Sequence, residues 1–197
     1  MKIGERVEKI STKAHYRILD TSVDGRIVLQ RLIIGGNSEN VLEVDDLRAF
    51  KLVREFKDTI SFFDGDYSFL ANSFESPVEY EGIKYSSVEH AFQASKTDNK
   101  EEKEKIMNAS SPTKARVIGR RVTKKDNWED TKNDIMYQIC LNKFKDNEEL
   151  KKKLLSTGNY NLINGNTSED TYWGVCKEVG DNYLGKILMQ IREELKD

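Results

Sequence analysis

A carboxylate, an amide and an amine lie at helical spacing within the stretch 86–96. At about 100° of rotation per residue, a helix through this stretch brings Glu89, Gln93 and Lys96 to one edge, beside an apolar stripe. A glutamate at the border of an apolar surface can have a raised pKa, as general acid catalysis requires. A partly desolvated lysine can attack a carbonyl or an anomeric carbon. One interpretation of this edge is therefore a catalytic acid/base with a partner amine.

The same edge also has a structural interpretation, because charged helix faces are commonly solvated. The neighbouring stripe consists of small or apolar side chains that must face the core, namely Val88, Ala91, Phe92 and Ser95. Ser86 or Ser87 can cap the first turn of the helix. His90 lies on another side, where we interpret it as structural. Spacing alone leaves the catalytic and the solvated interpretations of the edge both open.

Short strands are predicted before this helix. The run 59–63 has the composition of a strand and ends in the turn Asp64-Gly65-Asp66. The runs 77–80 and 83–85 flank Glu81-Gly82 and are predicted to form a hairpin. We therefore expect the helix that carries Glu89 to begin directly after an antiparallel pair of strands.

Helices are predicted to dominate after residue 96. Ser111-Pro112 is typical of a helix start, with a capping serine followed by proline at the first helical position. Asp126-Asn127 opens a long helix whose apolar residues keep helical spacing. Asn147 caps a short helix, and the last helix begins near Asn182. Residues 54–197 are therefore expected to form a mostly helical domain with a few short strands.

The first 53 residues have a different pattern, in which short apolar runs alternate with turn formers. Asp24-Gly25 and Gly35-Gly36-Asn37 are turn signals between such runs. We predict a small β-rich unit over residues 1–53, and no chemical motif is visible in it. The chain as a whole is therefore expected to be of the α+β class, with this unit preceding the domain over residues 54–197.

Composition limits the classes of function. The 197 residues have a formal net charge of −2, whereas a DNA-coating protein would be basic over a whole domain. Cys140 and Cys176 are too few for a disulfide scaffold and are predicted to be reduced and structural. With His15 and His90 as the only histidines and no Cys-x-x-Cys, we predict no metal site. The sequence has neither a signal peptide nor a run of about 18 apolar residues, so we expect a soluble, cytoplasmic protein that does not enter the membrane.

The stretch 87–96 resembles the Ser-x-Glu-His-x-Phe-Gln-Ala-x-Lys signature of the YbiA-like (NADAR) family. Five further blocks resemble the other motifs of the family, and all six are in family order. These five are Phe69-Leu70-Ala71-Asn72 with Pro77-Val78, Ser110-Ser111-Pro112 to Gly119-Arg120, Asn127-Trp128-Glu129 to Lys143-Phe144, Asp170-Thr171-Tyr172-Trp173-Gly174, and Asn182-Tyr183-Leu184-Gly185 to Glu193. Ala71 replaces a serine that is usual in the family, and Ser73 stands where an aromatic residue is common. The first 53 residues lie outside the resemblance.

The resemblance implies hydrolysis of N-glycosidic bonds at ribose or ribose phosphate, without a cofactor. It implies that Glu89 is the principal acid/base, that Lys96 is a candidate for a Schiff base with the opened ribose, and that Asp170 orients or activates the reacting groups. The residues expected to contact the substrate are Asn72, Gln93, Arg120, Trp128, Tyr172 and Trp173. A carboxylate near the sugar would stabilise the positive charge that develops as the bond breaks.

Several of these residues have structural alternatives. Trp128 begins a long helix and could belong to the core. Asp170 could cap a turn, and Glu169 is a nearby rival for its role. The basic residues between positions 111 and 132 fit either phosphate binding beside a helix start or a solvated basic face. Arg120, in the Gly-Arg pair of the family motif, is our choice for the phosphate contact.

The expected partner is a substrate that carries ADP-ribose or ribose phosphate, including ADP-ribosylated nucleic acid. The leading hypothesis is removal of ADP-ribose from modified guanine in nucleic acid or nucleotides. Hydrolysis of phosphorylated intermediates of riboflavin synthesis is the second, and a non-catalytic module that binds ADP-ribose or an NAD derivative is the third. An acid and an amine on one helix edge favour an enzyme over such a module.

Overall fold

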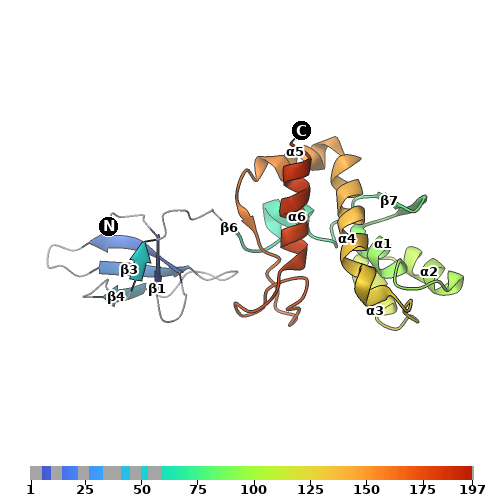
Figure 1. Cartoon of the computed structure of the whole chain (residues 1–197), viewed down its shortest axis with the longest axis horizontal. Coiled ribbons are helices and arrows are strands. Elements are labelled where there is room, and N and C mark those ends of the chain that lie inside the picture. Colours follow the sequence, from blue (N-terminus) through green and yellow to red (C-terminus); the bar gives the residue numbers. More distant parts are fainter. Residues whose placement is uncertain are drawn as a thin grey trace. The chain divides into compact units, whose positions relative to one another are not determined.

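The computed structural model describes residues 59–196 throughout and, before them, the backbone of five strands (Figure 1). The chain divides into two compact units, Met1–Asp58 and Thr59–Asp197. The predicted domain boundary after residue 53 lies outside the described residues, as do the two predicted turns at residues 24–25 and 35–37.

The strands of the first unit form one antiparallel sheet in the order β4-β3-β2-β1-β5. Four consecutive strands pair with their neighbours along the chain, and β5 pairs with β1. A register shift interrupts the pairing of β2 and β3 between Ile18 and Asp20. The strands are β1 (Arg6–Lys9), β2 (His15–Thr21), β3 (Ile27–Leu32), β4 (Val41–Val44) and β5 (Phe50–Leu52).

The second unit is a mixture of helices and very short strands, as the sequence predicts. Its helices are the 3₁₀ helix η1 (Gly65–Leu70) and the α-helices α1 (Val88–Ala94), α2 (Lys100–Met107), α3 (Pro112–Gly119), α4 (Trp128–Lys145), α5 (Glu148–Ser156) and α6 (Tyr183–Glu194). Its strands are β6 (Thr59–Ile60), β7 (Val78–Tyr80), β8 (Ile83–Tyr85) and β9 (Asn161–Leu162).

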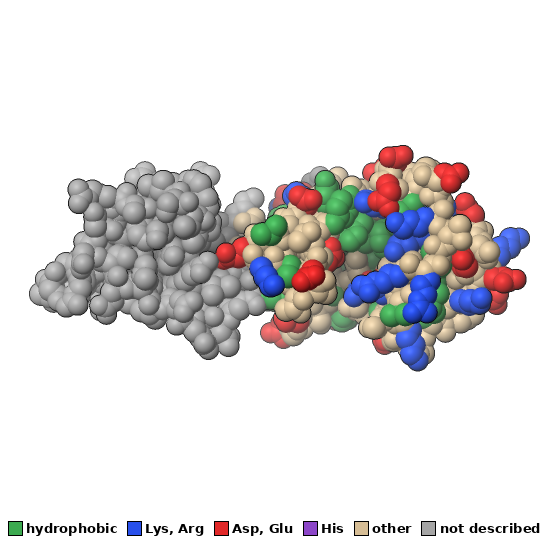
Figure 2. Space-filling view, turned by 90° about the horizontal axis from the view of Figure 1, so that it is seen from below, with side chains coloured by type: hydrophobic (Ala, Val, Ile, Leu, Met, Phe, Trp, Pro, Cys, Tyr) green, Lys and Arg blue, Asp and Glu red, His purple; other side chains and the backbone are tan. Residues whose placement is uncertain are grey.

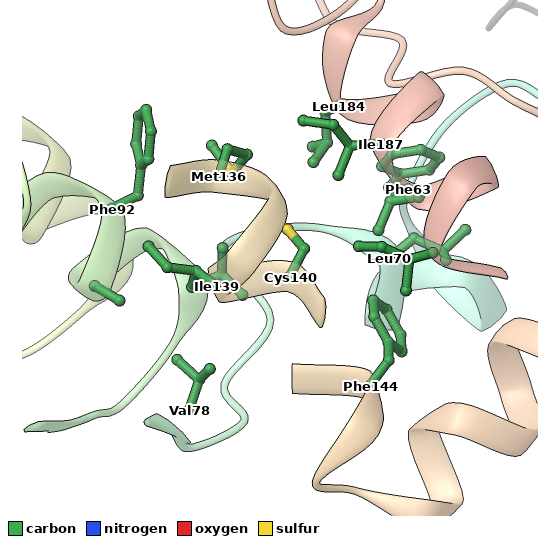
Figure 3. Close-up of a cluster of buried hydrophobic side chains, with 14 of the residues drawn as sticks. Phe63, Leu70, Val78, Phe92, Met136, Ile139, Cys140, Phe144, Leu184 and Ile187 are labelled. Atoms are coloured by element: carbon green, nitrogen blue, oxygen red, sulfur yellow. The ribbon is translucent and has the colours of Figure 1, made fainter. Parts of the chain in front are cut away.

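Helix α4 is the central element of this unit and packs against α1, α5, α6 and β7 (Figure 1). Side chains on its inward face are at most 2% exposed, namely Met136, Ile139, Cys140 and Phe144. Figure 3 shows them between Phe92 of α1 on one side and Leu184 and Ile187 of α6 on the other. The predicted apolar face of the long helix is therefore confirmed. Both cysteines are free and buried, also as predicted.

The hairpin before α1 is confirmed at the predicted position. β7 and β8 pair antiparallel from Val78 with Tyr85 to Tyr80 with Ile83. The two connecting residues have positive φ, with 50° at Glu81 and 75° at Gly82. A two-residue turn of this kind matches the twist of the flanking strands, and glycine adopts it without strain.

The strand predicted over residues 59–63 is shorter than expected. β6 contains only Thr59 and Ile60, which pair in parallel with Asn161 and Leu162 of β9. The sheet ends there because its partner strand is itself only two residues long. The predicted turn at residues 64–66 instead opens helix η1, which carries the buried residues Phe69 and Leu70 into the core.

Candidate active site

Helix α1 begins at a serine cap and is buried along its whole length. The Ser87 Oγ lies 2.8 Å from Nδ1 of His90 and accepts a hydrogen bond from the His90 backbone N–H at 3.4 Å. The Nε2 of His90 lies 3.1 Å from the carbonyl oxygen of Ala109, next to α3. His90 is 1% exposed with a partner at each ring nitrogen. The structural interpretation of this histidine is therefore confirmed.

The segment before the hairpin also supports the start of α1. The backbone carbonyl of Asn72 accepts a hydrogen bond from the Glu89 N–H at 2.9 Å. The Asn72 amide contacts two sulfur atoms of α4, with Nδ2 3.5 Å from Sδ of Met136 and Oδ1 3.9 Å from Sγ of Cys140. Asn72 is thus a fixed link between α4 and α1, beside the carboxylate that the sequence singles out.

The side chain of Glu89 is held by donors at both carboxylate oxygens. Its Oε1 accepts from Nε2 of Gln93 at 2.8 Å and from Nε of Arg116 at 3.1 Å, and its Oε2 accepts from Nη2 of Arg116 at 2.8 Å. Glu89 is 4% exposed and Gln93 is 5% exposed. The solvated interpretation of this helix edge is therefore wrong for both residues.

The sequence placed Arg116 only in the basic region between positions 111 and 132, so its role as the partner of Glu89 was missed. It reaches Glu89 from α3 in the two-point geometry that guanidinium groups form with carboxylates. The hydrogen bond to Glu89 raises the pKa of Arg116, as does the negative charge of Asp170. Arg116 lies one turn before Arg120 on the same helix, and that spacing was the signal available in the sequence. The choice of Glu89 as its partner follows only from how α3 packs on α1.

A glycine permits that packing. A Cβ placed on Gly119 of α3 would lie 2.1 Å from Oε1, 2.7 Å from Cβ and 2.8 Å from Cδ of Gln93. Gln93 is buried, and a change of its rotamer would move Oε1 and Cδ but not Cβ, so the overlap at 2.7 Å would remain. Close approach of α3 to α1 therefore depends on the missing side chain at position 119.

Lys96 follows α1 and is half-buried against aromatic rings. Its Nζ lies 5.8 Å from the ring centre of Phe92 and 5.9 Å from that of Trp128. Burial lowers the pKa of Lys96 to about 8. The negative charge of Glu89 opposes this shift, while the positive charges of Lys124 and Arg120 add to it. A large fraction of this amine is therefore neutral and nucleophilic near pH 8.

A second lysine with a lowered pKa differs from Lys96 in its surroundings. Burial also lowers the pKa of Lys143 to about 8. Its Nζ, however, donates to the carbonyl oxygens of Phe69 and Ala71 and is enclosed within the core. Of these two amines, Lys96 is the one that a substrate can reach.

Aromatic side chains form one connected cluster beside Lys96. Phe92 contacts Trp128 at 5.1 Å and Trp173 at 5.3 Å between ring centres. Trp173 contacts Tyr172 at 5.1 Å, and Tyr172 stacks on Tyr183 at 4.5 Å. Trp128 is 3% exposed, which supports its interpretation as a core residue, whereas Trp173 and Tyr172 are partly exposed.

Asp170 caps a turn, as its structural alternative stated. Its Oδ1 accepts hydrogen bonds from the backbone N–H groups of Tyr172 at 3.1 Å and Trp173 at 2.9 Å. Its negative charge also acts on Arg116, so the carboxylate lies in the electrostatic environment of the Glu89 pair. Its rival Glu169 is exposed with φ of 62°. The structure therefore brings the charge of Asp170 to bear on Arg116, the partner of Glu89.

Basic side chains surround this region. Figure 2 shows lysine and arginine side chains gathered over the part of the second unit that contains α3 and the start of α4. Lys124 and Lys132 both bind Glu129, at 2.8 and 2.6 Å, and Nζ of Lys132 lies 4.0 Å from the ring centre of Tyr172. Arg120, at the end of α3, is exposed to solvent. Part of the predicted basic region is thus neutralised, while Arg120 remains accessible to an anion.

Two negative findings concern the described residues alone. None of their histidine, cysteine, aspartate and glutamate side chains form a group of three or more that could hold a metal ion. Among the helices described, none is long and apolar enough to cross a membrane.

Three comparisons relate this geometry to known proteins. A family model described as "NADAR domain" matches residues 54–196. The N-glycosidase YbiA of Escherichia coli (strain K12) is 34% identical over 155 residues, which cover 76% of this chain and 96% of that protein. A riboflavin biosynthesis protein of Vibrio vulnificus (strain YJ016) is 33% identical over 137 residues, which cover 68% of this chain and 37% of that protein. The NMR structure of E. coli YbiA has a TM-score of 0.64 at 32% identity and covers 72% of this chain and 88% of that one.

Substitution of Gly119 by alanine tests the packing of α3 on α1. Alanine in place of a helical glycine normally stabilises by up to about 1 kcal/mol. Here the overlap with Gln93 should outweigh this gain, and we expect a net loss of about 1–3 kcal/mol in the free energy of unfolding. Denaturant unfolding measures it, with Val117→Ala on the exposed face of the same helix as control. An unchanged or higher stability of Gly119→Ala would contradict the role of this glycine.

An NMR titration tests the pKa of Lys96. With ¹³C-methylated lysines, we expect the Lys96 signal to titrate with a midpoint near 8, because burial disfavours the charged form. Lys132 provides an internal reference, since its hydrogen bond to Glu129 raises its pKa above the usual lysine range. The Lys96→Arg variant assigns the signal by its disappearance. A Lys96 midpoint in the ordinary lysine range would contradict the lowered pKa of this amine.

Proposed function

The chain belongs to the NADAR domain family, and on this premise we propose that it is an N-glycosidase that removes ADP-ribose from modified guanine. The observation that carries the proposal is a buried, fixed carboxylate at Glu89 whose charge acts on the half-buried amine of Lys96. The negative charge of Glu89 acts on Lys96, whose amine lies beside the Phe92 ring, and Phe92 contacts the partly exposed ring of Trp173. N-glycosidic hydrolysis requires groups of these two kinds, one for the developing sugar cation and one for the anomeric carbon.

Glu89 acts on the sugar and on the leaving base. When the glycosidic bond breaks, its electron pair goes to the base nitrogen and positive charge develops on the ribose. A carboxylate fixed by Gln93 and Arg116 stabilises that charge without having to reorganise. Glu89 then exchanges protons with the base and the incoming nucleophile, as the principal acid/base of the reaction.

Lys96 supplies the nucleophile in this proposal. Its neutral amine attacks the anomeric carbon, the ring C–O bond opens as the ring oxygen takes a proton, and a C=N bond forms. Water adds to this carbon, the C–N bond breaks, and the amine is regenerated. The lowered pKa makes the neutral amine available at slightly basic pH. Arg120, one of the two cations that help to lower it, would face the negatively charged phosphates of the substrate.

The remaining predicted residues shape the pocket. Asp170 holds the turn that presents Tyr172 and Trp173, and its charge supports Arg116. A planar base can stack on the partly exposed rings of these two residues, which is worth about 1–3 kcal/mol per base in nucleic-acid complexes. Asn72 fixes the start of α1 and, in this proposal, also borders the pocket.

A second candidate substrate is a phosphorylated intermediate of riboflavin synthesis. It is favoured by the similarity to the V. vulnificus protein, whose name refers to riboflavin biosynthesis. Such a substrate also presents a base on a ribose phosphate, so Glu89 and Lys96 would have the same roles. It carries fewer phosphate groups, however, and makes less use of the exposed Arg120.

A turnover assay with both substrate classes tests the function. Guanine-linked ADP-ribose in DNA, RNA and free nucleotide is incubated in parallel with phosphorylated riboflavin precursors, and release of the base is measured. We expect release of ADP-ribose, with kcat of Glu89→Gln lower by about 10²- to 10⁴-fold, because the amide cannot carry charge or a proton. Glu79→Gln, an exposed change on β7, is the matched control. No turnover of any of these substrates by the wild type would refute the proposed function.

Borohydride trapping tests the nucleophile separately. Reduction during turnover should convert the C=N bond into a stable adduct whose mass maps to Lys96, and Lys96→Arg should abolish it. The yield should rise as pH increases through about 8, because the neutral amine becomes the major form. Lys153→Arg, at an exposed position on α5, is the matched control. Turnover without a Lys96 adduct would indicate direct attack by water.

A further inference from the structure

A buried lysine on α4 has no part in the chemistry proposed above. Lys143 is 2% exposed, and its Nζ donates to the carbonyl oxygens of Phe69 at 2.7 Å and Ala71 at 3.0 Å. The ring centres of Phe74 and Phe144 lie 5.4 and 5.2 Å from this nitrogen. Within residues 59–196, no carboxylate forms an ion pair with it. Because an unpaired buried amine is costly, the two carbonyl groups must stay in place to satisfy it.

The segment that supplies these carbonyls is bound to α4 at further points. The amide of Asn72 contacts the sulfur atoms of Met136 and Cys140. Met136, Cys140 and Lys143 are spaced by four and three residues, so they lie on one face of α4. Lys143 is the only one of these three that can donate strong hydrogen bonds. Of the polar contacts between segment 69–72 and α4, the hydrogen bonds from this amine are therefore the strongest, beside the apolar packing of Phe69 and Leu70 in the core.

The anchored segment then reaches the candidate active site. The residue after Ala71 is Asn72, whose backbone carbonyl accepts the N–H of Glu89 at 2.9 Å. This hydrogen bond joins segment 69–72 to the first turn of α1 and helps to fix the position of that turn. A short series of contacts thus runs from Lys143 through the Ala71 carbonyl and the Asn72 carbonyl to the backbone of Glu89.

We propose that Lys143 is a positioning residue for the N-glycosidase site, which fixes the Asn72 carbonyl and, through it, the backbone of Glu89. Lys143 touches neither substrate nor reacting atoms, and it acts through segment 69–72 alone. Ala71 takes part through its backbone carbonyl, so the departure from the usual serine at this position leaves the contact intact. The effect of Lys143 on turnover rests on the proposed function, whereas its effect on the hydrogen exchange of the Glu89 amide does not.

Two measurements on Lys143→Met test this role. Methionine fills similar space but donates no hydrogen bond, so the carbonyls of Phe69 and Ala71 lose their partner. We expect the amide hydrogen of Glu89 to exchange at least about tenfold faster, because the Asn72 carbonyl is no longer fixed. We expect kcat to fall by about 10- to 100-fold with KM changed less than about threefold, as small displacements of a catalytic group cost rate. Lys143→Arg, which restores charged donors, should recover part of the protection of the Glu89 amide and part of kcat.

Arg192→Met is the matched control for lost stability. Arg192 is a buried cation of α6, 2% exposed, and it donates to Thr157 Oγ1 at 2.8 Å, next to α5. The Arg192→Met substitution should lower the free energy of unfolding without selectively changing the exchange rate of the Glu89 amide hydrogen. If Lys143→Met does not fold, Lys143→Gln, which keeps neutral N–H donors on a shorter chain, is measured by the same two criteria.

The outcomes separate this role from the proposed function. Faster exchange at Glu89 than in the control, together with the fall in kcat, supports positioning. Equal exchange at Glu89 in the Lys143 and Arg192 variants overturns it, as does a kcat within twofold of the Arg192 variant. If the wild type turns over none of the substrates, the proposed function fails, and the exchange measurement alone decides the role of Lys143.

Discussion

The burial of the Glu89 carboxylate is the constraint on which the arrangement of the site depends. A carboxylate removed from water is costly unless donors surround it. One donor comes from Gln93 on the same helix, and the other two come from Arg116 on α3. Arg116 can reach only because α3 lies directly on α1, where Gly119 meets Gln93. One buried charge therefore accounts for the position of α3, the identity of residue 119 and the partner of Arg116.

The exclusion of water also explains the lowered pKa of Lys96. Lys96 follows the end of α1, and its side chain lies against Phe92 and Trp128, where its ammonium form loses hydration. The positive charges of Arg120 and Lys124 disfavour that form further, although Glu89 opposes them. A cluster that fixes a carboxylate thus also favours a neutral amine close to it. N-glycosidic hydrolysis uses both effects, since it needs charge stabilisation at the sugar and a nucleophile at the anomeric carbon.

Helix α4 connects the aromatic and the polar parts of the site to the core. Trp128 at its start forms part of the surroundings of Lys96. Further along, Met136, Cys140 and Lys143 hold the segment that leads to Asn72 and so to the start of α1. Because the same helix also packs against α1, α5, α6 and β7, the site is supported by the central element of the unit. This is the kind of rigid support that catalytic geometry requires.

The sequence by itself determined the local structure and the order of the family motifs. Capping residues at Ser87, Ser111 and Asn147 and the Glu81-Gly82 turn act within a few residues, so they could be recognised without a fold. The strand at residues 59–63 was predicted too long, because its end is set by the distant partner β9.

Only the tertiary structure decided which polar residues are buried and with whom. Helical spacing brought Glu89 and Gln93 to one edge, but the exclusion of water from it depends on Arg116, 27 positions further along the chain. Lys143 has the sequence context of an ordinary helix lysine, and its burial depends on carbonyls 74 and 72 positions away. Such pairings arise when packed helices must satisfy buried donors and acceptors, and that requirement leaves no periodic pattern in the sequence.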